Sequence, residues 1–179
     1  MNRIVGHIAS LAQHLITVVT DPEQYRPPAC PHCGCAGLWR HGCYHRKVDR
    51  SAEGSLDRLD PVPVLRFLCR ACVRTCSRLP ACIAPRRWYD WLAQQAVLLL
   101  LLSGMSLNGC ARCSVRDRRT VRRWRAWLLE RGEQFAFFLR SRLPELGRFA
   151  NFGAFWRNVI EELSLQQAMV LLDRDLVVP

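Results

Sequence analysis

The sequence contains almost no lysine and comparatively few acidic residues. Lys47 is its single lysine, and 26 basic residues stand against 15 acidic ones, so the formal net charge is +11. An excess of this size indicates a polyanionic partner, of which nucleic acid is the simplest. Arginine suits that partner because its planar guanidinium grips phosphates and guanine edges with two hydrogen bonds.

Long hydrophobic runs are also missing. The most apolar stretch, 96–102, is far shorter than the roughly 20 residues needed to span a membrane, so we expect a buried helix there and no membrane partner. Residues 1–20 lack the continuous apolar segment of a secretory signal, because His7, Gln13 and His14 interrupt it. The ten cysteines are therefore expected in a reducing, cytoplasmic setting, where metal binding or packing is favoured over disulfides.

Two C-x-x-C pairs dominate the first half of the chain, Cys30 with Cys33 and Cys69 with Cys72. Two intervening residues let one tight turn aim both thiolates at a single ion, about 2.3 Å from each sulfur. Two such turns facing each other complete a closed tetrahedron, which suits a structural ion and leaves no position for a substrate. The pairs therefore predict one structural zinc ion in a small zinc ribbon of short antiparallel strands.

Other ligands and other roles for these cysteines stay open. The 35 residues between Cys33 and Cys69 exceed the roughly 15–20 of the commonest pattern, and we attribute the excess to a loop inserted at 50–61. Disulfides and simple burial are the competing interpretations of the two pairs. Seven further side chains are near enough in sequence to compete as ligands: Cys35, Cys43, Cys76, Cys82, His32, His41 and His45. Cys76, three residues after Cys72, is the strongest rival.

From Pro85 onward the hydrophobic pattern has a helical period, whereas strands are expected earlier, at 38–48 and 62–68. The expected helices are 3–19, 85–102, a short one within 105–115, 117–132, 133–142 and 152–173. The predicted class is α+β, mostly α. The predicted segments are an amphipathic helix (1–24), the zinc ribbon (25–84), a helix-turn-helix (85–132) and C-terminal helices (133–179).

The helix expected after Asp117, which would cap it, has two contrasting faces. Val121, Trp124 and Leu128 form an apolar stripe, and the arginines face away from it. Recognition helices reach base edges from their first turns, so this cluster predicts DNA contact. The candidate DNA-binding residues are Arg112, Arg116, Arg118, Arg119, Arg122 and Arg123, of which the first two precede the helix and are placed for phosphates. Cys110 and Cys113 form a third pair, but without a partner pair we expect them to pack in the core.

Three short motifs resemble those of a known family. Cys30-Pro31-His32-Cys33-Gly34 and the segment 66–80 are similar to the zinc ribbon at the amino end of several insertion-sequence transposases. The segment 120–124 resembles the start of the recognition helix that often follows that ribbon. The resemblance implies binding of double-stranded element-end DNA. A separately encoded transposase and a second copy of the chain are further expected partners, in a nucleoid-associated, cytoplasmic setting.

An insertion-sequence transposase also needs three carboxylates on a mixed α/β sheet to hold two metal ions. After Trp88 the sequence has scattered acidic residues but no set of strands to carry them. We therefore expect no enzymatic activity, and interpret the chain as an accessory protein, a truncated transposase or a domesticated regulator. The alternative is a protein–protein interaction module, in which the ribbon binds a partner and the arginines serve solubility.

Overall fold

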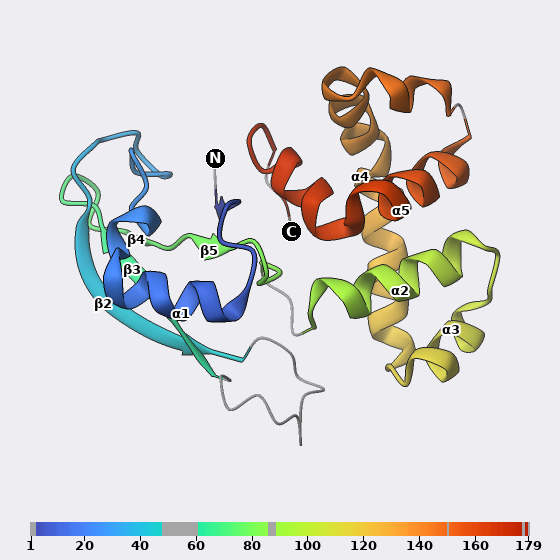
Figure 1. The fold of residues 1–179 in the computed structure, drawn as a ribbon, viewed down its shortest axis with the longest axis horizontal. Coiled ribbons are helices and arrows are strands. Elements are labelled where there is room, and N and C mark those ends of the chain that lie inside the picture. The colour runs from blue at the N-terminus through green and yellow to red at the C-terminus, as the bar shows by residue number, and fades with distance from the viewer. Residues whose placement is uncertain (1–2, 48–60, 86–88, 150, 177, 179) are drawn as a thin grey trace. The chain divides into compact units, whose positions relative to one another are not determined.

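The computed structural model describes residues 3–47, 61–85, 89–149, 151–176 and 178 (Figure 1). The chain divides into two compact units: unit 1 contains Met1–Asp90 with Asp173–Pro179, and unit 2 contains Trp91–Leu172. The class is α+β and mostly helical, as predicted, with a small antiparallel sheet. Unit 1 includes both of the first two predicted segments, 1–24 and 25–84, and the loop expected at 50–61 falls almost entirely outside the described residues.

Unit 1 is built on a three-stranded antiparallel sheet of order β2-β3-β4, in which Figure 1 shows β2 as a long curved strand. Its strands are β2 (Trp39–Arg46), β3 (Val62–Leu68) and β4 (Thr75–Cys76). The strands expected at 38–48 and 62–68 are therefore confirmed. The register of β2 against β3 shifts between Arg40 and Cys43, where Gly42 has a φ of 74°. Glycine permits this positive φ without a Cβ clash, so it accommodates the irregularity in the strand.

The N-terminal segment packs into the same unit. The helix expected at 3–19 is wrong in its first half: β1 (Ile4–Val5) pairs in parallel with β5 (Leu79–Pro80), and α1 spans only Leu11–Thr20. Ser10 caps α1, since its Oγ accepts a hydrogen bond from the backbone N–H of Gln13 at 3.1 Å. A 3-10 turn, η1 (Pro22–Tyr25), follows. Leu11 and Leu15 of α1 pack against the buried cluster that contains Val62 and Val64 of β3, so this helix belongs to the body of unit 1.

A buried histidine joins α1 to the sheet. The Nδ1 of His14 lies 2.6 Å from the Tyr25 hydroxyl, and its Nε2 lies 2.8 Å from the carbonyl oxygen of Pro63. The carbonyl can only accept, so Nε2 carries the proton and Nδ1 accepts from Tyr25. Burial lowers the pKa of His14, and the bond to Pro63 offsets part of that effect. His14 is thus held as the neutral imidazole.

Unit 2 contains only helices among its described residues: α2 (Trp91–Leu102), α3 (Leu107–Ser114), α4 (Arg118–Arg142), η2 (Pro144–Arg148) and α5 (Phe152–Leu172). The predicted stop of α2 is confirmed, but its predicted start at Pro85 is wrong, because Pro85, Tyr89 and Asp90 are not helical and the helix begins at Trp91. Gly104 has a φ of 92°, its N–H bonds the Leu101 carbonyl, and the next N–H, of Met105, bonds the Leu100 carbonyl. This pair of bonds satisfies the last carbonyls of the helix. In the described part of the chain, no helix has the length and apolar character needed to cross a membrane.

The helix end predicted at Gly132 is wrong, because α4 continues through it to Arg142. A Cβ at Gly132 would lie 2.6 Å from the ring of Phe152 and 3.0 Å from Nε1 of Trp156. Glycine is therefore required here for close packing of α5 against α4, as Figure 1 shows for the two helices.

The last helix is interrupted at Ser164, whose φ of 66° is not helical.

Candidate metal centre and basic helix

Four cysteine sulfurs from two separate turns meet at one point. The Sγ atoms of Cys30, Cys33, Cys69 and Cys72 all lie within 4.8 Å of one another. Cys30 and Cys72 are 3.6 Å apart, as are Cys33 and Cys69. A tetrahedron with metal–sulfur bonds of about 2.3 Å has edges of about 3.8 Å, whereas a disulfide needs about 2.05 Å. The four thiols are free, and their spacing fits one metal ion.

The two turns that carry these cysteines have the same backbone hydrogen bonds. In the first, Gly34 N–H donates to Cys30 O and Cys30 N–H donates to Cys35 O, both at 2.8 Å. In the second, Val73 N–H donates to Cys69 O at 2.9 Å and Cys69 N–H donates to Arg74 O at 3.0 Å. The local spacing of each pair therefore produces one repeated turn, and the β2–β3–β4 sheet brings the two turns together.

Each turn also needs a left-handed residue directly after its second cysteine. Gly34 takes this place in the first turn with a φ of 75°, and Val73 takes it in the second with a φ of 54°. A β-branched residue is strained in this region, because its side chain crowds the backbone. Val73 nevertheless adopts this positive φ, because the two backbone hydrogen bonds of the turn require it.

Cys76, the strongest rival ligand, lies outside the four-sulfur group. Its Sγ donates instead to the Phe67 carbonyl oxygen at 3.7 Å, and burial together with the neighbouring thiolates raises its pKa to about 11. Among the described residues, the only group of three or more potential ligands is the four-cysteine group. The remaining candidates from the sequence, Cys35, Cys43, Cys82, His32, His41 and His45, do not join it.

The four sulfurs differ in how readily they ionise. Cys30 and Cys69 are buried in a core with Tyr25, Leu38 and Phe67. Burial opposes ionisation of Cys30, but the backbone N–H groups of His32 and Cys33 donate to its sulfur and lower its pKa to about 7. The backbone N–H groups of Cys35 and Arg74 act in the same direction on Cys33 and Cys72, but burial and hydrogen bonds among the thiols raise the pKa of both above its usual value. A metal binds the deprotonated sulfur, so binding would have to displace protons from these thiols.

The second candidate site lies at the start of α4. Only residues 115–117 separate α3 from α4, and Val115 makes the turn with a φ of 52°. Asp117 caps α4 by accepting a hydrogen bond from Arg119 N–H at 2.7 Å. Figure 1 shows α3 beside this first part of α4.

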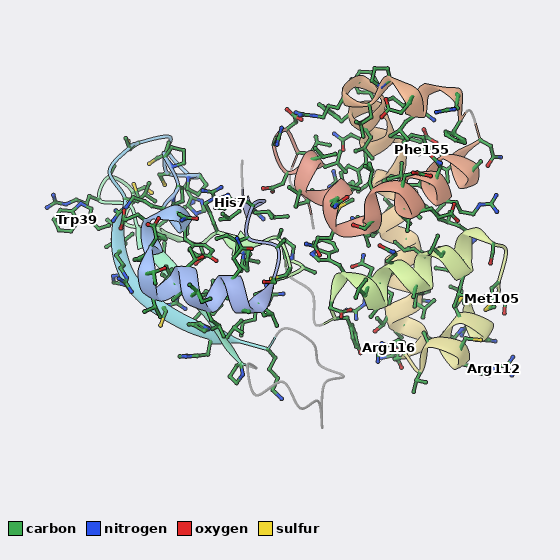
Figure 2. All side chains as sticks on the ribbon, viewed as in Figure 1. His7, Trp39, Met105, Arg112, Arg116 and Phe155 are labelled. Atoms are coloured by element: carbon green, nitrogen blue, oxygen red, sulfur yellow. The ribbon has the colours of Figure 1, made fainter. Side chains whose placement is uncertain are left out.

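The two faces of α4 separate as its sequence pattern predicts. The predicted stripe of Val121, Trp124 and Leu128 is buried. Five of the six predicted DNA-binding arginines are exposed, namely Arg112, Arg118, Arg119, Arg122 and Arg123. Arg116 is half-buried and lies, like Arg112, at the same end of unit 2 (Figure 2).

The start of α4 is hollowed and strongly cationic. Asp117, Arg118, Arg119 and Arg122 line a hollow of about 390 Å³. Within the described part of the chain, the guanidinium groups of these three arginines form no ion pair. Arg123 differs, because it donates to the Thr120 hydroxyl of its own helix at 3.3 Å. The arrangement leaves three positive side chains available to an anion at a helix N-terminus, where backbone N–H groups add to the attraction.

The third cysteine pair does not form a metal group. Cys110 is buried and its thiol donates to the Met105 carbonyl oxygen at 3.8 Å, whereas Cys113 is exposed. The expected packing in the core is thus confirmed for Cys110 and wrong for Cys113.

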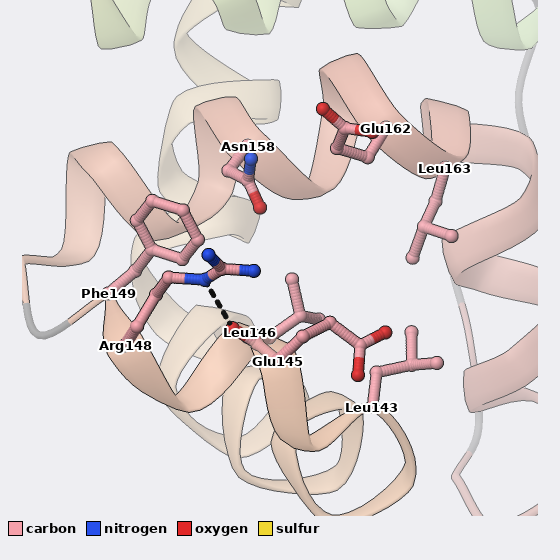
Figure 3. Close-up of a pocket in the computed structure, with 8 residues that line it drawn as sticks. All are labelled: Leu143, Glu145, Leu146, Arg148, Phe149, Asn158, Glu162 and Leu163. Carbon is pink, nitrogen blue, oxygen red and sulfur yellow. Dashed lines mark hydrogen bonds between the residues drawn. The ribbon is translucent and has the colours of Figure 1, made fainter.

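A further cavity, of about 440 Å³, lies between η2 and α5 (Figure 3). Its polar lining consists of Glu145, Arg148, Asn158 and Glu162, and leucines with Phe149 complete it. The Arg148 Nε donates to the Glu145 carbonyl oxygen at 3.0 Å, the bond drawn as a dashed line in Figure 3. Among the described residues that line the cavity there is no cysteine, histidine or serine to act as a nucleophile, so we assign it no chemistry.

Sequence reasoning missed one feature of unit 1. The guanidinium carbon of Arg70 lies 4.2 Å from the ring centroid of Trp39. The tryptophan and the arginine are evident in the sequence, but they lie 31 positions apart, and no sequence pattern links the start of β2 to the second cysteine turn. Only the folded chain reveals the contact.

No protein-family model matches this chain, and neither the search of curated proteins nor that of solved structures finds a significant match.

Proposed function

We propose that this chain is a non-catalytic, sequence-specific DNA-binding protein that carries one structural zinc ion. The observation that carries the proposal is a cluster of exposed arginines at the capped start of α4, Arg118, Arg119 and Arg122, which form no ion pair with any residue that the structure describes. A short helix, a three-residue turn and a second helix whose first turns are basic are the parts of a helix-turn-helix. The proposed role is that of an accessory protein, truncated transposase or domesticated regulator.

In this proposal the two groups of arginines have different tasks. Arg119 and Arg122 face away from the buried stripe, so in a major groove each can fork onto a guanine edge. Arg112 and Arg116 lie before the helix, where they meet phosphates, and such contacts are blind to sequence. Ala126, further along the helix, is small enough to let it approach the groove closely.

Salt titrations of the full chain on its selected DNA site and on random duplex test this division. We expect Arg122→Ala to weaken binding to the selected site about 5- to 150-fold, which corresponds to the 1–3 kcal/mol of one base contact, and to affect random duplex less. Arg116→Ala is expected to weaken both duplexes equally and to reduce the salt slope by about one unit.

Arg131→Ala is the matched control. It removes the same charge from an exposed position of the same helix, about 13 Å further along at 1.5 Å per residue. It is expected to change neither affinity beyond a small electrostatic effect. If Arg119→Ala and Arg122→Ala both leave the two affinities unchanged, α4 is not the reading helix, and the protein-interaction alternative replaces the proposal.

The zinc assignment is supported by the donor set, because four thiolates at tetrahedral spacing are the ligands of structural zinc. Binding would supply much of the folding free energy of unit 1, about 10–16 kcal/mol by analogy with zinc fingers. We expect Cys33→Ser to lose the metal and unfold residues 28–80 while the helices of unit 2 stay folded. Elemental analysis and circular dichroism measure the two effects.

Cys35→Ser is the matched control for the zinc assignment, since Cys35 is exposed, two residues from Cys33 and outside the four-sulfur group. It is expected to retain one zinc ion per chain. Retention of zinc by Cys33→Ser together with its loss in Cys76→Ser would replace the ligand set with one that includes Cys76.

A further inference from the structure

Two arginine–aromatic stacks that involve exposed arginines lie on the sheet of unit 1. The Arg70 guanidinium carbon is 4.2 Å from the Trp39 ring centroid, and that of Arg66 is 5.1 Å from the Tyr44 ring centroid. Both distances fall within the roughly 6 Å over which a cation is attracted to an aromatic face. The second cysteine turn supplies Arg70, so the metal centre helps to position the first stack.

The strand register places these side chains on one face. Trp39 pairs with Leu68 and Tyr44 pairs with Val64. Residues that pair across an antiparallel sheet, and residues two apart along a strand, point to the same side. Arg66 lies two residues from both partners, so Trp39, Tyr44 and Arg66 share a face, which with Arg70 we call the stacking face.

Trp39 is unusually exposed for its size. It retains 55% of its accessible surface, and Figure 2 shows its side chain projecting away from β2. Tryptophan is normally buried for most of its area or placed where it contacts a partner. Arg70 lies over the ring, so a second planar group can stack only on the opposite face of the ring.

The surroundings of Trp39 are cationic. No aspartate or glutamate occurs in 39–47 or 61–78, the segments that hold β2, β3, β4 and the second cysteine turn. The exposed arginines in these segments are Arg40, Arg66, Arg70 and Arg74. Arginines around an exposed aromatic ring are the combination that binds single strands, in which bases stack on the ring and phosphates follow the positive charge.

We propose that the stacking face binds single-stranded nucleic acid, with an unpaired base on the free face of Trp39 and phosphates held by Arg66 and Arg70. A single strand fits better than a duplex, because base faces in a duplex are already stacked on their neighbours and cannot reach the ring. The stacked guanidinium keeps its N–H edge available for a phosphate. This second surface goes beyond the proposed duplex binding and uses none of the arginines of α4.

Fluorescence anisotropy with the zinc-loaded full chain tests the inference on three probes: oligothymidylate, oligouridylate and a mixed-sequence duplex. Trp39→Ala is expected to weaken single-strand binding about 5- to 150-fold, the effect of one lost base stack, and to leave duplex affinity unchanged. Trp39→Phe is expected to retain most of the affinity, because it keeps an aromatic face. The oligomer that binds more tightly identifies DNA or RNA as the source of the single strand.

Phe137→Ala is the matched control, since it removes another exposed aromatic side chain, one that lies on α4 in unit 2. It is expected to change no affinity. Arg70→Gln gives an independent reading if Trp39→Ala fails to fold, because it is expected to reduce the salt slope for single strands by about 0.7 units, the effect of one lost phosphate contact.

Unchanged single-strand affinity in Trp39→Ala, or an equal loss on single strands and duplex, would overturn the inference. Unchanged duplex affinity in both Arg119→Ala and Arg122→Ala would instead overturn only the proposed function, so the two failures are distinguishable.

Discussion

Replacing Val73 with glycine should strengthen zinc binding, which is the opposite of what glycine usually does to a folded chain. Val73 occupies the left-handed position of the second cysteine turn with a φ of 54°, and Gly34 occupies the equivalent position of the first. The Val73 side chain is 75% exposed, so its removal sacrifices little packing. The substitution therefore acts mainly on backbone strain.

The expected change in the free energy of zinc-coupled folding follows from two opposing contributions. Relief of the left-handed strain of a β-branched residue contributes about 1–2 kcal/mol. The greater freedom of glycine in the unfolded chain costs about 0.5–1 kcal/mol. At the middle of both ranges the net gain for Val73→Gly is about 0.75 kcal/mol, and Gly34→Val should lose a similar amount.

Chelator competition measures the effect, because folding of this unit is expected to be coupled to metal binding. Val73→Gly should bind zinc about 2- to 5-fold more tightly, and Gly34→Val about 2- to 5-fold more weakly. Val115→Gly is the control: Val115 also has a positive φ, of 52°, but lies in unit 2, so zinc affinity should not change. Weaker zinc binding by Val73→Gly would refute the assignment of strain to this turn.

Two further predictions concern stability, one in each unit. Burial lowers the pKa of His14, so as the pH falls the unfolded chain takes up this proton before the folded chain does. The stabilisation of unit 1 by His14 is therefore complete above about pH 6.5 and decreases as the pH drops below that value. Asp173 acts in the opposite direction, since burial raises its pKa to about 6, so the pH dependence of the wild type alone would mix the two effects. The measurement is therefore the difference in urea midpoint between wild type and His14→Phe at several pH values. A pH-independent difference would contradict the prediction. In unit 2, Gly132→Ala should lower the thermal midpoint of unfolding. A Cβ at this position would lie 3.0 Å from the Trp156 Nε1 atom and force a buried ring to move, which costs about 1–3 kcal/mol. This cost exceeds the roughly 1 kcal/mol that alanine gains in helix propensity. A raised midpoint would show that the α4–α5 contact yields easily.

Features set by a few neighbouring residues were predictable from the sequence. The C-x-x-C spacing indicated turns that aim two sulfurs together, and both turns have that form. Asp117 indicated the start of α4, and Gly104 provides the predicted end of α2. The buried stripe of α4 followed from its period alone. In each case the deciding contact lies within about one helical turn or one tight turn, so the local sequence contains the information.

Features that join distant segments were decided by the tertiary structure. The sequence left Cys76 as a rival ligand, and the pairing of β3 with β4 turned its thiol toward the Phe67 carbonyl instead. Gly132 resembled a helix end, but α5 packs so closely that a Cβ has no room, and the helix continues. Likewise, Trp39 and Arg70 meet only because antiparallel pairing brings the start of β2 beside the second cysteine turn. Strand register and helix packing depend on the simultaneous burial of many side chains, and no short stretch of sequence specifies that.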